Sequence, residues 1–518
     1  MPKKNLVLNL FEMNCVSHIV HGLWPHPDNN RHRINDIAYW KELAQLLEYG
    51  TFDGVFLADV IGVYDTYRGG LETAVREAMQ IPRNDPFLAI AAMSAVTRHL
   101  GFGGTFSTSY EPPFSFAQRL STLDHLTNGR IGWNIVTSYL PNAAQNFGLE
   151  KEIPHDRRFE IADEYIDVLY KLWEGSWEDD AVVLDRENRI YANPEKVHYI
   201  DHVSDRYRVK GPHLTQPSRQ RTPVLFQATG SRAGAEFAGR HAEVVFTGGG
   251  TPEQVRANIR LMKERALAHG RTEDAIKFLV RAAVIVGRTE LEAQKKLEGY
   301  RQYQSVEAAL AHGQAQLDLT HHPRDARLAD VLPKEYSGHW RILAERRPET
   351  TVGEALHQLG GFNEGRYFVV GTPKIVVDEI ERWLDEDGID GINLLQFLSF
   401  ETARDFIELV VPELRRRGRF RERYTEDETL RERLFGAGHA RLPPDHYGAR
   451  YRNNPQALKA FPNRLHFPDP VTPGAASGGV ADATSAARDF SEAVAAASRA
   501  VAASPTEAVP AQQQQPLS

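Results

Sequence analysis

Hydrophobic positions along the chain follow two alternating patterns. Short runs of β-branched and other apolar residues are typical of buried strands, and most of these runs are followed by a stretch with apolar residues at helical spacing. The eight predicted strands are residues 6–10, 55–58, 100–105, 131–136, 224–228, 243–246, 278–286 and 391–397.

The helical pattern is clearest in three of the intervening stretches. Residues 34–48 and 159–173 carry apolar side chains three and four positions apart, and residues 372–384 open with Pro373, a common residue in a first helical turn. Alternating strands and helices indicate a parallel sheet of the α/β class. Eight such units predict a closed (β/α)8 TIM barrel.

Two long stretches, residues 177–223 and 300–362, do not fit the alternation. We expect both to be insertions at the C-terminal rim of the barrel, where long loops form lids or substrate walls. The barrel is then expected to span residues 1–425, followed by a C-terminal extension at 426–469. Residues 470–518 are low-complexity and hold too little apolar surface to offset the entropy of ordering, so we predict a disordered tail.

The composition excludes several classes of protein. Apolar residues at 42% and charged residues at 25% are ordinary for a globular enzyme, and the net charge of −8 is mild. No Lys/Arg stripe carries interleaved aromatic residues, so we expect no nucleic-acid binding. Cys15 is the only cysteine, which excludes disulfides within the chain, and no window is apolar enough to span a membrane. The prediction is a cytoplasmic protein.

Polar residues gather at the predicted ends of the strands, where ligands bind in a barrel. These positions are rich in neutral hydrogen-bonding groups, and we find no Ser-His-Asp or Cys-His arrangement. The pattern indicates a site that holds a cofactor, which then supplies the reactivity. The positions include Asp59, Thr105, Asn134, Thr137, Thr229, Gly230 and Ser231.

Two predicted helix starts suit an anion. The turn around Ser231 could cradle a phosphate with its free N–H groups, or it could be an ordinary turn with a serine cap. The second start carries His155 and Arg158, with Asp156 as the expected N-cap. It could bind an anion or be a solvated capping turn. Neither GxGxxG nor a Walker motif is present.

His18 and His21 follow the first predicted strand. A metal-dependent barrel hydrolase would place His-x-His here and add later His and Asp ligands. The spacing in this chain is His-x-x-His, and no acidic ligand completes the set. We therefore predict no metal and expect a polar substrate wall around His21 and Trp24.

Several ordered segments carry a family resemblance. Residues 121–138 read STLDHLTNGRIGWNIVTS, residues 155–173 read HDRRFEIADEYIDVLYKLW, and residues 223–246 contain the ATGSRAG turn. In these motifs the chain resembles the bacterial-luciferase-like flavin monooxygenases. The resembling branch contains the large components of nitrilotriacetate, dibenzothiophene-sulfone and long-chain alkane monooxygenases. The resemblance covers roughly residues 5–425.

The resemblance implies a two-component system. FMN would arrive as FMNH2 from a separate NAD(P)H:flavin reductase and react with O2 to form a flavin C4a-peroxide, which oxidises a small organic substrate. Such a species needs a dry pocket. We also expect a homo-oligomer, either a dimer or a tetramer.

The resemblance also assigns roles to residues. It implies His21 and Asn134 as catalytic residues, and it places Phe159 where the family usually has Tyr. The turn Thr229-Gly230-Ser231 departs from the family's Gly-x-Ser but keeps the serine. The FMN-binding residues implied are Asp59, Thr105, Asn134 and Thr137 near the ring, and His155, Arg158, Phe159, Thr229, Gly230 and Ser231 near the phosphate.

Two other functions stay open at this level. A related barrel oxidoreductase could use flavin or deazaflavin for hydride transfer without O2. A non-catalytic flavin-binding protein would share the same pocket. Oxygen uptake with externally reduced FMN separates these readings.

Overall fold

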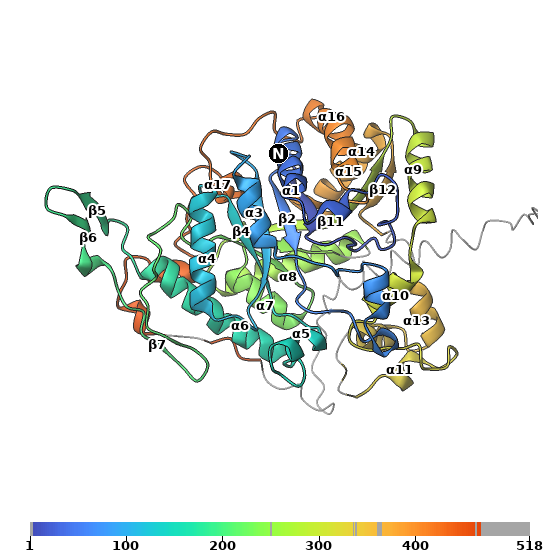
Figure 1. The fold of residues 1–518 in the computed structure, drawn as a ribbon, viewed down its shortest axis with the longest axis horizontal. Helices are drawn as coiled ribbons and strands as arrows, with labels where there is room; N and C mark the ends of the chain where they lie inside the picture. Colours follow the sequence, from blue (N-terminus) through green and yellow to red (C-terminus); the bar gives the residue numbers. More distant parts are fainter. Residues whose placement is uncertain are drawn as a thin grey trace, which may run out of the picture.

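Eight parallel strands close into a barrel (Figure 1). Each strand pairs with the next, and β13 pairs with β1 to complete the ring. In order around the barrel they are β1 (Val7–Met13), β2 (Gly54–Ala58), β3 (Gly101–Ser107), β4 (Ile131–Val136), β9 (Val224–Ala228), β10 (Val244–Phe246), β11 (Lys277–Val286) and β13 (Gly391–Leu395). The predicted TIM barrel is confirmed, with strand ends that differ by at most three residues.

The structure is a computed structural model that describes residues 4–248, 251–334, 336, 339–359, 365–460 and 464–467. Within these ranges, no helix is both long and apolar enough to cross a membrane. The predicted disordered tail at 470–518 lies outside the described residues.

Helices cover the outside of the barrel. The three predicted helices are present as α1 (Ile37–Tyr49), α6 (His155–Tyr170) and α14 (Pro373–Arg382). The other barrel helices are α3 (Pro86–Ser94), α4 (Pro113–Leu126), α7 (Arg232–His241), α8 (Pro252–Ala268), α9 (Glu290–Gln302), α15 (Glu401–Asp405) and α16 (Val411–Arg416). Asp156 is not the N-cap of α6, because the helix already begins at His155 after Pro154.

Aromatic side chains fill the interior of the barrel. Phe56 on β2 and Phe246 on β10 meet across it with ring centroids 4.5 Å apart, and Phe226 on β9 stacks on Phe246 at 6.0 Å. At the N-terminal end, Leu430 and Leu434 of α17 (Leu430–Phe435) pack against the same apolar cluster. The C-terminal extension therefore seals one end of the barrel, and the ligand-binding end lies at the other.

The extension is joined to the barrel by buried polar contacts. The Arg431 guanidinium donates to the Glu243 carboxylate at 2.7 Å and to the Thr222 carbonyl at 2.8 Å. Farther along, the Tyr447 hydroxyl donates to Asp167 on α6 at 3.1 Å. Residues 426–469, which we expected to form an extension after the barrel, thus complete the packing of the barrel.

A ninth strand, β12 (Phe368–Gly371), was missed by the hydrophobic pattern. It pairs with the last four residues of β11, on the side where β10 has already ended. Because β11 is longer than its neighbours, its free end recruits this strand outside the closed ring. The hydrophobic pattern of one strand does not show whether a second strand will pair with its end.

The two insertions lie at opposite ends of the barrel. Residues 300–362 follow α9 on the C-terminal side, as expected, and form α10 (Val306–Gly313), α11 (Leu328–Val331), α12 (His339–Arg346) and α13 (Val352–Leu359). Residues 177–223 instead connect the end of α6 to β9, so this insertion begins and ends at the N-terminal rim. Arg221 closes its base by donating to the carbonyls of Trp173 and Trp177. The expected C-terminal position is corrected here, because α6 begins after the C-terminal end of β4, runs back along the barrel and ends beside the start of β9.

The insertion at residues 177–223 contains two antiparallel hairpins. They are built from β5 (Val182–Asp185) with β6 (Ile190–Ala192), and from β7 (His202–Val203) with β8 (Arg208–Val209). The β5–β6 hairpin lies at the far left of Figure 1, away from the barrel strands.

Candidate functional site

A cavity of about 270 Å³ opens among the C-terminal ends of the barrel strands. Phe11, Phe56 and Phe246 form apolar walls, and Asn134 and Asn393 contribute carboxamides from opposite sides. The lining comes from seven of the eight barrel strands, all but β3, and from the segment that leads into β12. An apolar pocket with a few converging polar groups is the usual form of a small-molecule site.

Only one of the two polar atoms of the Asn134 carboxamide has a hydrogen-bond partner. Its Nδ2 donates to the Thr105 hydroxyl at 3.0 Å, while its Oδ1 is buried and has no partner. The Oδ1 of Asn393 is in the same state. A buried acceptor without a donor costs about 1–3 kcal/mol, so both atoms favour a ligand that brings N–H or O–H groups into the cavity.

Asp59 follows β2 at the rim and is held by Arg83, which donates to its carboxylate. Burial raises the pKa of Asp59 to about 6, although the Arg83 guanidinium opposes this change. The carboxyl group therefore changes its charge just below neutral pH. Asp59 thus lies at the rim. The sequence pattern gave no indication of its partner, Arg83.

The loop after β4 is fastened from two sides. Ser138 adopts a left-handed backbone conformation (φ 53°), and its hydroxyl donates to Ser107 Oγ at 2.8 Å. The carbonyl of the preceding Thr137 accepts a hydrogen bond from Ser109 Oγ at 2.7 Å. Arg158 on α6 donates to the Ser138 carbonyl. These contacts position the start of α6 over the end of β4.

The starts of α6 and α7 pack together beside this loop. Phe159 on α6 contacts Phe237 on α7 with ring centroids 5.8 Å apart. Arg158 is 7% exposed, its Nε has no partner, and burial lowers its pKa. His155, at the first position of α6, is paired with the carboxylate of Asp156 at 2.7 Å. The structure thus brings a buried cation and a histidine to the rim.

The turn before α7 has the features of an anion site. Ser231 is the N-cap of α7 and accepts from Gly234 N at 3.1 Å, so the serine cap is present. The neighbouring Thr229 hydroxyl is buried without a partner. A Cβ at Gly234 would lie 1.8 Å from that hydroxyl, so glycine is needed for this close approach. Gly230 gives the turn a backbone without a side chain beside these groups.

His21 has a partner that the sequence did not reveal. Its Nε2 lies 3.1 Å from Nδ1 of His312 on α10, and its Nδ1 lies 3.3 Å from the Ser17 hydroxyl. Burial, together with the neighbouring His312, lowers the pKa of His21 well below 6.5. Burial also lowers the pKa of His312 to about 4. Both imidazoles are therefore neutral near pH 7.

A pair of tyrosines extends this polar group toward the surface. The hydroxyls of Tyr64 and Tyr139 lie 2.8 Å apart, and the Tyr64 ring meets the His312 ring edge-on at 5.0 Å. Tyr64 is buried, whereas Tyr139 is partly exposed. The first insertion helix, α10, thus packs against the loops after β1 and β2, beside the residues that line the cavity.

Among the described residues, no group of three or more His, Cys, Asp or Glu side chains could hold a metal ion. His18 is buried against the ring of Phe11, with centroids 4.7 Å apart.

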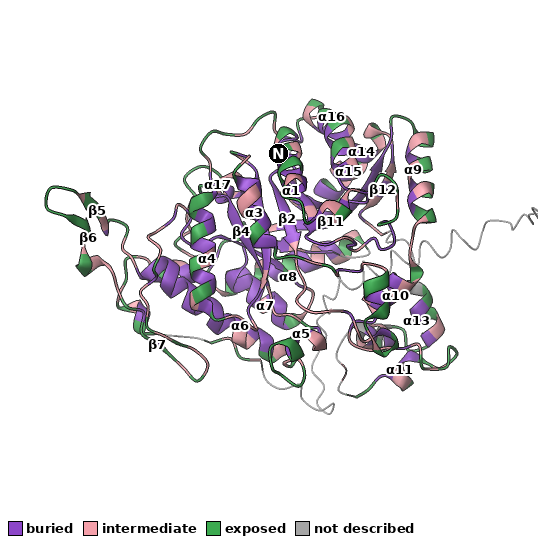
Figure 2. Cartoon of the chain, viewed as in Figure 1, coloured by how far each residue is buried: buried purple, intermediate pink, exposed green. Residues whose placement is uncertain are grey.

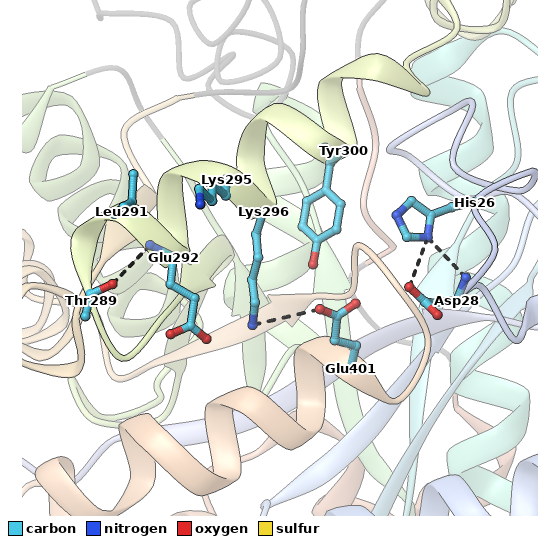
Figure 3. A pocket seen from close by; sticks show the side chains of 10 residues that line it. His26, Asp28, Thr289, Leu291, Glu292, Lys295, Lys296, Tyr300 and Glu401 are labelled. Carbon is cyan, nitrogen blue, oxygen red and sulfur yellow. Dashed lines mark hydrogen bonds and ion pairs between the residues drawn. The ribbon is translucent and has the colours of Figure 1, made fainter.

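A second cavity of about 480 Å³ lies outside the barrel, between α9 and α15 (Figure 3). Charged side chains dominate its lining, with Lys296 3.8 Å from Glu401 and His26 3.9 Å from Asp28. None of the predicted site residues lines it. The barrel cavity is therefore the candidate site.

The chain is similar to known proteins over most of its length. The family model described as luciferase-like monooxygenase matches residues 13–391. The chain is 51% identical to the long-chain alkane monooxygenase of Geobacillus thermodenitrificans, over 87% of this chain and 98% of that protein. It is 44% identical to the dimethyl-sulfide monooxygenase of Hyphomicrobium sulfonivorans, over 87% and 94%.

A solved structure extends the comparison to a bound flavin. The crystal structure of a riboflavin lyase with modified FMN and riboflavin is 38% identical to this chain, with a TM-score of 0.81. The alignment covers 87% of this chain and 100% of that one.

Proposed function

Since this chain belongs to the luciferase-like monooxygenase family and is an FMN-dependent monooxygenase, we propose that it is the oxygenase component of a two-component system. It would receive reduced FMN and use O2 to oxidise a small organic substrate. The observation that carries this proposal is the barrel cavity, which Asn134 and Asn393 line with buried acceptors that lack donors and which reaches Ala228, the last residue of β9 before the turn into α7.

The residues at the helix starts fit a phosphate group. Arg158 offers a buried guanidinium, and Thr229 and Ser231 offer hydroxyls beside the N-terminus of α7. A helix N-terminus favours negative charge because its first N–H groups lack partners. His155 and Phe159 would flank the phosphate, and Gly230 would let it approach the backbone.

The residues within the barrel fit a polar aromatic ring. Phe11, Phe56 and Phe246 supply the apolar contact, and the Asn134 carboxamide offers a free acceptor. We propose that Asp59, Thr105 and Thr137 hold the edges of the isoalloxazine ring and the ribityl chain. Asn134 would touch the reacting side of the ring.

When bound, reduced FMN supplies the two electrons that let one oxygen atom of O2 enter the substrate while the other leaves as water. The chain contributes exclusion of water and control of protons. We propose that Phe11, Phe56 and Phe246 keep water out of the cavity. We propose that neutral His21, fixed between Ser17 and His312, holds or accepts a proton at its Nε2 or Nδ1 during the reaction.

The source of reduced flavin must be external in this proposal. The sequence holds no GxGxxG motif for a dinucleotide, so a separate NAD(P)H:flavin reductase would deliver FMNH2 in the cytoplasm. The aromatic walls favour a weakly polar substrate, and alkanes and dialkyl sulfides are the first probes because two relatives are named for them. We also propose a homo-oligomer.

The test is a reconstituted reaction. The protein, oxygen and chemically reduced FMN are mixed with a panel of alkanes, sulfides and sulfones, and oxygen uptake is measured together with oxygenated product. Product formation that incorporates label from ¹⁸O2 supports the proposal. FMN reoxidation without uptake of O2 would indicate hydride transfer to an organic acceptor. Flavin binding with no turnover across the panel would favour a non-catalytic role.

A further inference from the structure

The outer face of α6 is covered by other parts of the chain. A helix on the outside of a barrel usually presents one polar face to water, but residues 158–170 are buried except for two that are half-buried. Figure 2 accordingly shows this helix mainly in the colour of buried residues. A carboxylate in such a place needs hydrogen-bond donors, because an unpaired buried charge is costly. The carboxylates on this helix are those of Asp156, Glu160, Asp163, Glu164 and Asp167.

Two of these carboxylates are held by residues 464–467, which we call the strap. The backbone N–H of Leu465 donates to Asp163 Oδ2 at 2.9 Å, and that of Phe467 donates to Glu160 Oε1 at 3.1 Å. Donors two residues apart on the strap thus meet acceptors three residues apart on α6. The strap lies more than 290 positions from this helix in sequence.

The side chains of the strap alternate between the protein and the solvent. Leu465 and Phe467 are half-buried and pack against the main hydrophobic cluster, whereas Arg464 and His466 are exposed. The Nδ1 atom of His466 also lies 2.9 Å from Glu160 Oε1. Such alternation is the pattern of an extended segment with one face docked on a surface.

Asp163 connects the strap to α7. It is 1% exposed, and its Oδ1 lies 2.8 Å from His241 Nε2 and 3.2 Å from a guanidinium nitrogen of Arg240. Burial raises the pKa of Asp163 to about 6, and Arg240 and the N–H of Leu465 oppose this rise. The strap therefore helps to keep the carboxyl ionised, and an ionised carboxyl holds α6 against α7.

Both carboxylates lie in about the first three turns of α6, the part of the helix that faces the proposed phosphate site. Arg158 and Phe159 directly precede Glu160, and Phe159 contacts Phe237 on α7. Contacts that fix these turns against α7 also fix the distance from the Arg158 guanidinium to the N-terminus of α7. A carboxylate that lost its strap donor would in addition repel a nearby phosphate.

We propose that the strap is a positioning segment for FMN, which holds the start of α6 against α7 and thereby raises the affinity for the phosphate. This inference rests on the proposed function, of which the phosphate site is a part. The strap acts through Glu160 and Asp163, neither of which is proposed to touch the flavin. Riboflavin has the same ring and lacks the phosphate, so its affinity should not depend on the strap.

The experiment removes one donor from the full-length chain. Leu465→Pro lacks the N–H that reaches Asp163, and Leu465→Ala is the matched control because it shortens the same side chain and keeps the N–H. Fluorescence titration should show Leu465→Pro binding FMN about fivefold more weakly or worse, with riboflavin affinity changed by less than about twofold. Leu465→Ala should stay within about twofold of wild type for both ligands. Phe467→Pro and Phe467→Ala repeat the comparison at Glu160.

Hydrogen exchange of the flavin-free protein gives a second measurement. The amides of residues 155–163 should exchange faster in Leu465→Pro than in Leu465→Ala. Equal losses for FMN and riboflavin, equal behaviour of the two variants, or unchanged exchange would each overturn the proposal. A preference for FMN that survives in Leu465→Pro overturns this inference alone. A wild type without that preference contradicts the phosphate site itself, and this inference fails with it.

Discussion

His312 places its imidazole 3.1 Å from that of His21, across 291 positions of sequence. One ring comes from the loop after β1 and the other from α10 of the insertion. Because both rings are neutral near pH 7, one must donate and the other accept, so each fixes the tautomer of its partner.

Replacing His312 should therefore disturb His21 without removing it. We expect His312→Ala to lower product formed per O2 consumed and to lower kcat/KM by roughly tenfold or more, with released hydrogen peroxide rising in proportion. FMN affinity should change by less than about twofold. His321→Ala is the control, since this residue is exposed in the same insertion. Wild-type coupling in His312→Ala would contradict the role of the pair.

Ser231 should discriminate FMN from riboflavin. Ser231→Ala removes a hydroxyl from the proposed phosphate site, and a lost hydrogen bond to a charged group weakens binding by about 1.5–3 kcal/mol. The variant should lose at least tenfold in affinity for FMN and keep its affinity for riboflavin, measured by fluorescence titration. Thr289→Ala, which removes the equivalent cap of α9, controls for the cost of a lost cap. Equal losses for both ligands would rule out a phosphate contact.

Asp59 should make stability depend on pH between about 4 and 6. Its pKa is raised to about 6 in the folded protein, so in this window the native state holds a proton that the unfolded chain has released. Its contribution to the free energy of unfolding therefore falls as pH rises from 4 to 6 and is constant above. Denaturant unfolding of the apoprotein should show Asp59→Asn gaining stability relative to wild type over that window. Asp28→Asn, an exposed carboxylate, should show no such trend.

Gly22 should be essential for the packing of the insertion at residues 300–362 against the loop after β1. A Cβ there would lie 2.1 Å from the Tyr303 carbonyl, and its φ of +100° is unfavourable for other residues. Gly22→Ala should displace the chain before α10, raise hydrogen peroxide release and speed proteolysis within the insertion. Gly299→Ala on α9 meets no atom within 4 Å and should be neutral or slightly stabilising. Identical proteolysis of both variants would show that the contact is not needed.

Arg431 should contribute strongly to stability. Its buried pair with Glu243 links the extension to the barrel, and removing one partner of a buried pair costs about 3–5 kcal/mol. Denaturant unfolding of Arg431→Met should show a loss in this range. Arg441→Met breaks a half-exposed pair with Asp179 and should cost less than about 1 kcal/mol. A small effect at Arg431 would mean that the extension is only loosely attached.

The regular part of the fold could be predicted from local pattern. Eight buried strands and the helices between them follow from the spacing of apolar residues, and the motif around Asn134 and Arg158 pointed to the right family. The rim positions of Asp59, Thr105 and Ser231 followed from where strands end. The roles of these residues toward FMN stay predictions.

Other features depended on contacts between distant segments. β12 forms because β11 extends beyond the end of β10, and residues 177–223 begin at the N-terminal rim because α6 ends there, beside the start of β9. Neither property can be predicted from the composition of the segment itself. The pairing of Asp59 with Arg83 likewise needs the folded loop.

The sequence by itself determined the barrel, because apolar runs and helical spacing depend only on neighbouring residues, and it determined which polar residues reach the rim. Only the tertiary structure decided which of them meet. His21 gains His312, Arg158 is buried against Ser138, and the hydroxyl of Thr229 is left without a partner beside α7. Burial and through-space distance set these pairings and their pKa values, and both depend on the whole packed chain.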